Sequence, residues 1–252
     1  MSRFDQELAG DVAIVTGGAH NIGRATCLSL ADAGAAICVN AMTSGADAEA
    51  LSMEIEAAGG QAMHYLADVT DPNAVRAMTD AVVARFGKLS ILVNNAAVRG
   101  NTPLEELTLT EWRRIFNPIV EGTMLCTQAA LPHIRTAGGG TIICLGGIAS
   151  YVGVAGRSHV GAAKAALGGF MKGLVHEVGG DGIRVNTVVP GHIDTARGAS
   201  AGARPNYDMK FVLDRSGQPE EVADMIRTLC GPAGRYVTGQ TVHVSGGVYM
   251  PG

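Results

Sequence analysis

The sequence has few cysteines, no excess of positive charge and no long apolar run. Its five cysteines are widely spaced and include no C-x-x-C pair, which argues against a disulfide framework. With 19 basic and 23 acidic residues the formal net charge is -4, so nothing favours binding to nucleic acid or to a membrane surface. No stretch reaches the roughly 20 apolar residues of a membrane span, and the polar first eight residues lack the core of a signal peptide. We therefore expect a cytoplasmic protein with reduced thiols.

Metal ligands in a recognisable pattern are also missing. The seven histidines include no H-E-x-x-H pair, and no cysteine cluster accompanies them. Zinc sites of the common types need such spacings, because their ligands must converge on one ion. We expect no metal.

The sequence does contain a regular alternation of short apolar runs and longer helix-length segments. Runs that are apolar throughout are typical of strands buried on both faces, as in parallel sheets. The expected strands are residues 12–16, 36–40, 62–66, 91–94, 141–145, 183–189 and 241–244, and the expected helices are residues 22–32, 46–58, 73–86, 110–134, 158–178 and 219–229. This order predicts an α/β fold, a Rossmann-like doubly wound parallel sheet of about seven strands flanked by helices. With no linker or repeat, residues 1–252 should form a single dinucleotide-binding domain.

Two features interrupt this pattern. Pro118 falls inside the long helix 110–134, where it removes one N–H and crowds the carbonyl of Arg114, so we expect a kink there. Residues 192–215 form a long irregular stretch rich in Gly, Ala and Arg. Loops of this length are usually lids or binding loops.

A glycine-rich turn joins the first expected strand to the first helix. It reads Thr16-Gly17-Gly18-Ala19-His20-Asn21-Ile22-Gly23. Glycines let the backbone approach a pyrophosphate, and the start of the helix offers unpaired N–H groups and the positive end of its dipole. The turn therefore predicts a dinucleotide site.

The turn resembles the T-G-x-x-x-G-x-G motif of short-chain dehydrogenases/reductases, with Asn21 in place of the middle glycine. Further motifs of this family follow in order over residues 10–250: Asp68-Val69, Asn94-Asn95-Ala96-Ala97, Pro190-Gly191-His192-Ile193-Asp194-Thr195, and Val237-Thr238-Gly239-Gln240 with Ser245-Gly246-Gly247. The resemblance implies NADP or NAD as cofactor. It assigns the cofactor to Gly17, His20, Asn21, Ile22, Gly23, Asn40, Asp68, Val69, Asn95, Ala96, Lys164, Pro190, Gly191, Ile193 and Thr195.

The choice between NAD and NADP rests on the end of the second strand. An acidic residue there binds a ribose 2′-hydroxyl, and basic residues nearby hold a 2′-phosphate. The position is Asn40, which carries neither charge. His20, Thr43 and Ser44 could contact a 2′-phosphate, which tilts the expectation slightly to NADP, although they could equally be ordinary turn residues.

The resemblance also implies a catalytic set of Tyr, Lys, Ser and Asn, and most of it is missing. Lys164 matches the family's lysine, but four residues earlier stands Val160 in place of the tyrosine. Gly147 occupies the serine position and Ile119 the asparagine position. An adjacent cation lowers the pKa of a phenol so that it can transfer protons near neutral pH. Valine can do nothing of the kind, so conventional reductase activity should be weak or absent.

The catalytic candidates are Lys164, His192 and Tyr151. Lys164 is the retained member of the family's set and could serve only the cofactor ribose, whereas the other two could replace the missing proton donor. His192 follows the Pro-Gly turn, and Tyr151 lies on the loop that borders the substrate pocket in this family. His159, next to the tyrosine position, should point elsewhere, because one residue turns a helical side chain by about 100°.

Three functions remain open. The first is an NAD(P)-dependent oxidoreductase acting on a small alcohol or ketone. The second is a catalytically silent nucleotide-binding or regulatory protein, and the third is a non-redox enzyme, of lyase or hydrolase type, that uses the same pocket. The resemblance and the small residues of helix 161–169 also imply a homodimer or homotetramer.

Overall fold

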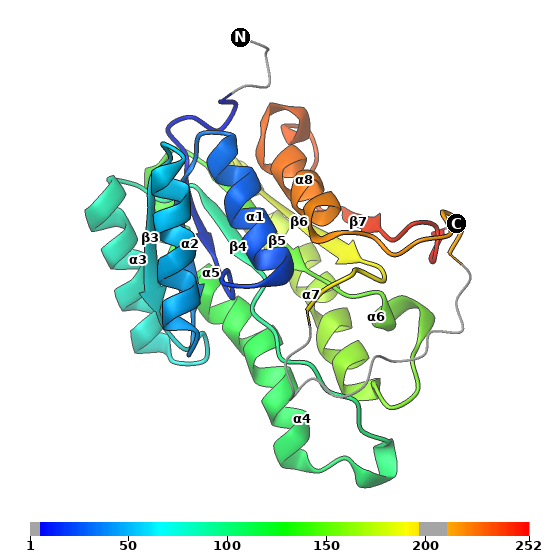
Figure 1. The fold of residues 1–252 in the computed structure, drawn as a ribbon. Coiled ribbons are helices and arrows are strands. Elements are labelled where there is room, and N and C mark those ends of the chain that lie inside the picture. Colours follow the sequence, from blue (N-terminus) through cyan, green and yellow to red (C-terminus); the bar gives the residue numbers. More distant parts are fainter. Residues whose placement is uncertain (1–5, 197–210, 252) are drawn as a thin grey trace.

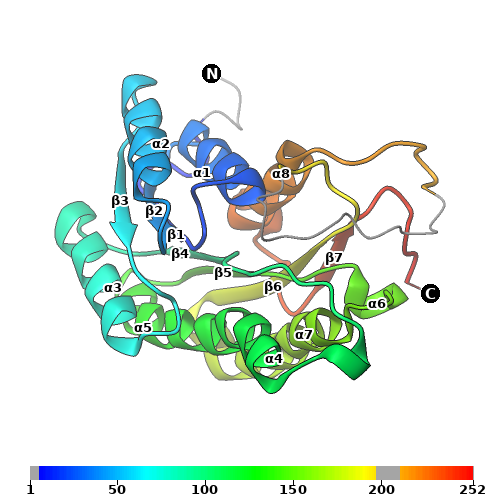
Figure 2. The same cartoon turned by 60° about the horizontal axis from the view of Figure 1, so that its bottom comes forward.

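A seven-stranded parallel sheet forms the centre of the computed structural model, which describes residues 6–196 and 211–251. The strand order is β3-β2-β1-β4-β5-β6-β7, seen edge-on in Figure 2. The strands are β1 (Val12–Val15), β2 (Ala36–Ala41), β3 (Ala62–Leu66), β4 (Ile91–Asn94), β5 (Gly140–Leu145), β6 (Ile183–Pro190) and β7 (Thr241–Val244). This confirms the predicted doubly wound α/β fold. The bounds agree with the predicted strands to within one residue.

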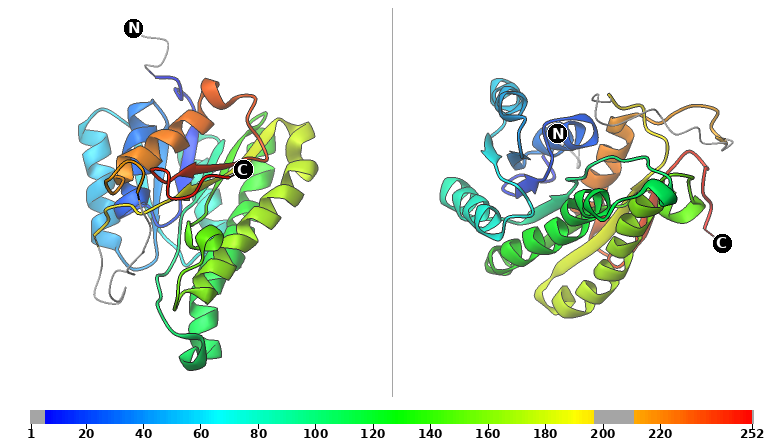
Figure 3. Two further views of the ribbon diagram at one scale, coloured as in Figure 1. Left: turned by 90° about the vertical axis from the view of Figure 1, so that its right-hand side faces the viewer. Right: turned by 90° about the horizontal axis from the view of Figure 1, so that it is seen from below.

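Helices cover both faces of the sheet, as Figures 1 and 2 and the right-hand view of Figure 3 show. One face carries α1 (Asn21–Asp32), α2 (Gly45–Ala57) and α8 (Pro219–Cys230). The other carries α3 (Pro72–Phe86), α5 (Gly122–Thr136) and α7 (Ser158–Val178), with α4 (Leu109–Phe116) extending from it. The central strands lie between two apolar layers, which explains why β1, β2 and β4 are buried along their whole length.

The predicted helix starts are present in the structure. At α3 the Asp71 carboxylate accepts hydrogen bonds from the N–H groups of Asn73 and Ala74 at 2.8 and 3.3 Å, and Pro72 opens the helix. At α8, Gln218 and Glu221 form a capping box. Proline suits the first turn because its missing N–H would have no partner there.

The expected helix 110–134 is a chain of three segments, α4, a π-helical turn η2 (Asn117–Glu121) and α5. Pro118 lies in η2, where the Gly122 N–H bonds to the Asn117 carbonyl, five residues back. Such a wider turn absorbs a residue that cannot join the regular hydrogen-bond ladder. The predicted irregularity at Pro118 is confirmed, and its form is a π-helical turn that brings Ile119 into the protein interior.

Several short elements were not predicted. They are η1 (Leu104–Glu106), α6 (Ala149–Val152), η3 (Gly179–Asp181) and η5 (Pro232–Gly234). Each is too short to give a periodic pattern. Most of the predicted lid, residues 197–210, lies outside the described residues; its described ends are tied together where Ile193 pairs with Gly217. Within residues 6–196 and 211–251 no helix is long and apolar enough to cross a membrane.

Candidate active site

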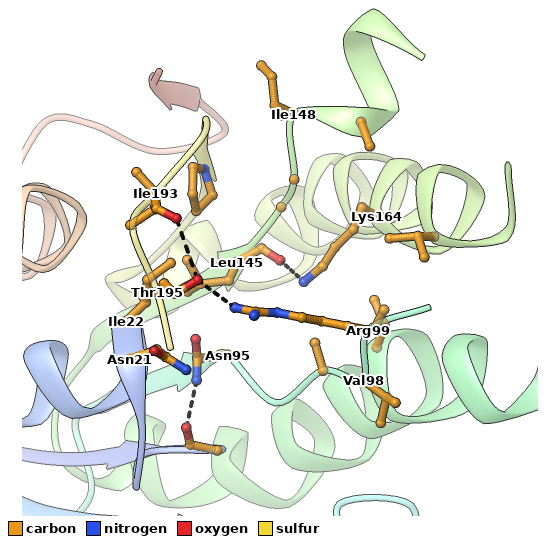
Figure 4. A pocket seen from close by; sticks show the side chains of 18 of the residues that line it. Asn21, Ile22, Asn95, Val98, Arg99, Leu145, Ile148, Lys164, Ile193 and Thr195 are labelled. Atoms are coloured by element: carbon orange, nitrogen blue, oxygen red, sulfur yellow. Dashed lines mark hydrogen bonds between the residues drawn. The ribbon is translucent and has the colours of Figure 1, made fainter. Parts of the chain in front are cut away.

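A cavity of about 570 Å³ opens at the carboxyl ends of the strands. It lies where β1 and β4 are neighbours, the point at which the chain reverses its direction across the sheet. Ligands of doubly wound folds bind at this switch point. Most of the predicted site residues line it, namely Gly17, His20, Asn21, Ile22, Asn95, Ala96, Lys164, Pro190, Gly191, His192, Ile193 and Thr195. Figure 4 shows the central part of this wall.

The phosphate-binding turn needs an unusual backbone at two positions. Gly17 has φ of 60° and Asn21 has φ of 50°, a region in which glycine is at ease and asparagine is better tolerated than most other residues. Asn21 therefore substitutes for the family's middle glycine without changing the turn. Gly23 faces the turn from α1, and a Cβ added there would lie 2.2 Å from the Gly17 carbonyl oxygen.

Two asparagines hold this turn from behind. Asn95 donates through Nδ2 to the carbonyl oxygens of Thr16 and Gly17, at 2.8 and 2.9 Å. Asn40 accepts from the Gly17 N–H at 3.3 Å and donates to the Ala67 carbonyl at 3.1 Å. Asn40 is 1% exposed, and its hydrogen bonds position the turn. A contact of Asn40 with the cofactor ribose stays a prediction.

The start of α1 fits a pyrophosphate. Gly17, Asn21 and Ile22 line the cavity there, and the N-cap residue His20 makes no side-chain hydrogen bond to the amides of the helix. These amides belong to the positive end of the helix dipole. The turn at Gly17 and the amides at the start of α1 together suit the binding of a dinucleotide phosphate.

Like Asn40, three further predicted cofactor residues do not line this cavity. Gly23 is buried in α1. Asp68 is engaged locally, because its carboxylate accepts from the N–H and the hydroxyl of Thr70 at 2.9 and 2.8 Å. Val69 is buried against Gly122. A contact of Asp68 or Val69 with adenine stays a prediction.

Lys164 extends from α7 into the cavity, where its Nζ donates to the carbonyl oxygen of Leu145 (Figure 4). Burial lowers the pKa of this amine from 10.5 to about 8, against a smaller opposing effect of Cys144. Such a group is mostly protonated at pH 7 and can exchange its proton near neutrality. Val160, Gly147 and Ile119 line the same cavity.

The other candidate proton donors lie in different places. His192 lines the cavity, and its Nδ1 lies 3.0 Å from the Ser216 hydroxyl. Tyr151 does not line it: the ring packs against His243 and Tyr249, with centroids 4.5 and 5.1 Å away. The structure therefore does not place Tyr151 where a catalytic role would need it.

His159 does not line the cavity either. It is fully buried, and neither ring nitrogen has a hydrogen-bond partner. Burial lowers its pKa, so the neutral imidazole packs as part of the interior. The expectation that it points away from the cavity agrees with this placement.

Two charged residues of the wall, Arg157 and Arg99, are outside the set of site residues predicted from the sequence. Arg157 lines the cavity beside Val160 and Lys164. The spacing 157, 160 and 164 places these positions on one helix face. The position of Lys164 in the sequence could therefore have been used to predict that Arg157 lines the cavity. Arg99 follows the Asn95-Ala96 segment and extends across the cavity toward Thr195 (Figure 4).

Comparisons with known proteins agree with this architecture. A family model described as Enoyl-(Acyl carrier protein) reductase matches residues 17–249. The chain is 37% identical to a 3-oxoacyl-(acyl carrier protein) reductase of Synechocystis sp., covering 96% of this chain and 98% of that protein. It is also 37% identical, with the same coverage, to a cis-4-hydroxycyclohexanecarboxylate dehydrogenase of Sinomonas cyclohexanicum.

A solved structure is similarly close. A short-chain dehydrogenase of Burkholderia cenocepacia in complex with NADP has a TM-score of 0.87 and 37% identity, with 96% of this chain and 99% of that chain covered. The predicted nicotinamide cofactor, NADP or NAD, is thereby confirmed as that of the family. This chain therefore belongs to the short-chain dehydrogenase/reductase family of oxidoreductases.

Proposed function

We propose that this protein is an NADP(H)-linked oxidoreductase that acts slowly on a small carbonyl or alcohol. The observation that carries the proposal is the composition of one wall of the cavity. Lys164 is there, while the positions assigned to the family's tyrosine, serine and asparagine are Val160, Gly147 and Ile119, and all three line the cavity with it. Their convergence from α7, the end of β5 and η2 supports the alignment.

The dinucleotide, when bound, supplies a hydride to a carbonyl carbon. The protein has to hold it, orient the substrate and provide a proton for the carbonyl oxygen. The turn around Gly17 and the start of α1 hold the phosphates, and Asn95 keeps the turn in shape. Ile193 and Thr195 line the same cavity.

Lys164 is the proton carrier that we assign. Its ammonium lies inside the cavity against the Leu145 carbonyl, and its pKa of about 8 keeps it protonated at neutral pH. His192 is a second candidate on the same wall. Losing an optimised general acid costs about 10²–10⁴-fold in rate, so activity should survive at a reduced level.

NADP is the form we favour. The His20 ring lies at the mouth of the cavity, with Nε2 3.2 Å from the Ser44 hydroxyl and 3.4 Å from the Asp47 carboxylate. The His20 imidazole and the Ser44 hydroxyl can both donate hydrogen bonds to a 2′-phosphate. The Burkholderia relative, which was crystallised with NADP, supports the same choice.

Assembly and location are part of the proposal. A Cβ at Gly168 or Gly169 on α7 would meet nothing within 4 Å, so this helix face is open to a second copy, and we keep the homodimer or homotetramer as expected. The five cysteines are free and buried, which suits the reducing cytoplasm.

The experiment is a fluorescence titration with NADPH and NADH, followed by a panel of small ketones and alcohols assayed with the tighter-binding nucleotide. We expect tight NADPH binding and slow but measurable hydride transfer that is lost in Lys164→Met. Nucleotide binding without any transfer would identify the silent nucleotide-binding alternative, and no nucleotide binding would overturn the proposal.

A further inference from the structure

The charged side chains of the cavity wall are all of one sign. Among the described residues that line it, Arg99, Arg157 and Lys164 are cations, His20 and His192 are imidazoles, and none is Asp or Glu. The whole chain has more acidic than basic residues, so composition does not account for this bias. An apolar-walled cavity with cations strengthens the attraction of an anion.

The two arginines are more than the dinucleotide needs. The turn at Gly17 and the start of α1 already supply backbone N–H groups for the phosphates of the dinucleotide. Arg99 comes from the loop after β4 and lies beside Lys164 in Figure 4. Arg157 comes from the loop just before α7, the helix that carries Val160 and Lys164. They therefore belong to the region that receives the substrate.

These arginines are held on connected loops. The Thr102 N–H donates to the Gly156 carbonyl at 2.7 Å, which ties the loop of Arg99 to the residue before Arg157. Arg114 donates to the Arg99 carbonyl at 3.0 Å. Arg114 is itself fixed by a two-point pair with Glu111 at 2.6 and 2.7 Å.

The Arg99 guanidinium lies in the part of the cavity where the reaction is proposed to occur. Its Nη2 donates to the Thr195 hydroxyl at 2.9 Å, and in Figure 4 the side chain crosses the cavity between Lys164 and Asn95. An anion on this guanidinium would lie close to the proton carrier. A planar guanidinium binds a carboxylate through two parallel hydrogen bonds.

The remaining wall is apolar. Val98, Ile119, Ile148 and Val160 line it, and they suit a hydrocarbon body better than a sugar. We propose that Arg99 and Arg157 form an anion subsite, and that the substrate is a small oxo acid or hydroxy acid with an apolar body and one carboxylate. This inference rests on the proposed function, because it places the substrate in the same cavity.

The test measures binding and does not need turnover. Benzoate, its neutral analogue benzamide, and phenyl phosphate are titrated by calorimetry into the protein with and without saturating NADPH. We expect benzoate to bind at least about tenfold more tightly than benzamide, since hydrogen bonds to charged groups contribute that much. Arg99→Gln and Arg157→Gln should each remove most of that preference, Arg99→Lys should restore part of it, and NADPH binding should change little.

Arg85→Gln is the matched control, because Arg85 is exposed on α3 and lies outside the cavity wall. It should bind benzoate as the wild type does. Equal binding of benzoate and benzamide, or unchanged preference in both arginine variants, would overturn the anion subsite. Tighter binding of phenyl phosphate than of benzoate would overturn the carboxylate class. Arginine-dependent benzoate binding in a protein that transfers no hydride would keep the subsite and reject the proposed function.

Discussion

Val160 lies one helical turn before Lys164 on α7, and both side chains line the same cavity. The aliphatic side chain thus occupies the position at which a tyrosine would have its pKa lowered by the lysine. Because valine has no proton to give, the buried ammonium has to act alone or with His192. The low rate that we propose follows from this pair.

Restoring the missing groups should raise activity. Val160→Tyr combined with Gly147→Ser should increase carbonyl reduction by about 10²-fold or more, because a phenol beside Lys164 becomes an effective general acid. A Cβ at Gly147 would lie 3.3 Å from Cγ of Lys164, a contact that the flexible lysine can relieve. The measurement is kcat with NADPH and a ketone substrate.

The control for this gain is Val160→Phe with Gly147→Ser, which adds the ring without the hydroxyl. It should give no increase. A gain of the same size in the phenylalanine variant, or none in the tyrosine variant, would show that the alignment is misplaced.

The reduction rate should depend on the protonation of Lys164. Burial lowers the pKa of this residue to about 8, so the ammonium is present below that pH and is lost as pH rises through it. The reduction rate should therefore fall by about tenfold for each pH unit above 8. A pH profile of kcat checks this, with Lys172→Met as the control because Lys172 is exposed on the same helix. A reduction rate that stays constant to pH 10 would show that Lys164 is not the proton carrier.

The turn at Gly17 should be intolerant of a side chain. Gly17→Ala places a Cβ 3.1 Å from the Ala96 Cα on a backbone with φ of 60°. NADPH affinity should fall by about tenfold or more as the turn shifts, at a strain of about 1–3 kcal/mol. Gly59→Ala shares the positive φ but meets nothing within 4 Å, so it should lower stability and leave affinity unchanged. Equal NADPH affinities for both variants in a fluorescence titration would contradict the assignment of this turn to the nucleotide phosphates.

His20 and Asp47 should set the preference between the two nucleotides in opposite directions. Their side chains are 3.4 Å apart at the mouth of the cavity. His20→Ala should weaken NADPH binding by about threefold to tenfold through a lost donor, and Asp47→Asn should strengthen it by removing a repelling charge. NADH binding should change little in either variant. The measurement is the Kd of each nucleotide, and parallel changes for NADPH and NADH would reject this assignment.

Sequence patterns were sufficient for the sheet and for most of the cavity wall. β1 is apolar throughout and β4 is apolar up to Asn94, and the turn between Thr16 and Gly23 has a spacing that physical chemistry can interpret. Motifs at the ends of strands converge because all the strands are parallel. This explains why Asn95 and Ile193 could be predicted together.

Side-chain directions and local adjustments were harder to predict. Asn40 lies near the end of β2, and its side-chain amide hydrogen-bonds to the Gly17 N–H and the Ala67 carbonyl. Tyr151 turns to the rings of His243 and Tyr249, which are distant in sequence. Pro118 signalled a break in the helix, but a π-helical turn depends on how Ile119 packs. Such outcomes are set by tertiary contacts that no local pattern encodes.

The most direct test of the central claim is the single-turnover rate of hydride transfer from NADPH in the wild-type protein, measured with saturating ketone or oxo acid. The account predicts firm nucleotide binding and a chemical step about 10²-fold or more below the 1–10³ s⁻¹ typical of enzymes. A rate within that ordinary range, in a protein whose cavity holds valine at position 160, would contradict it.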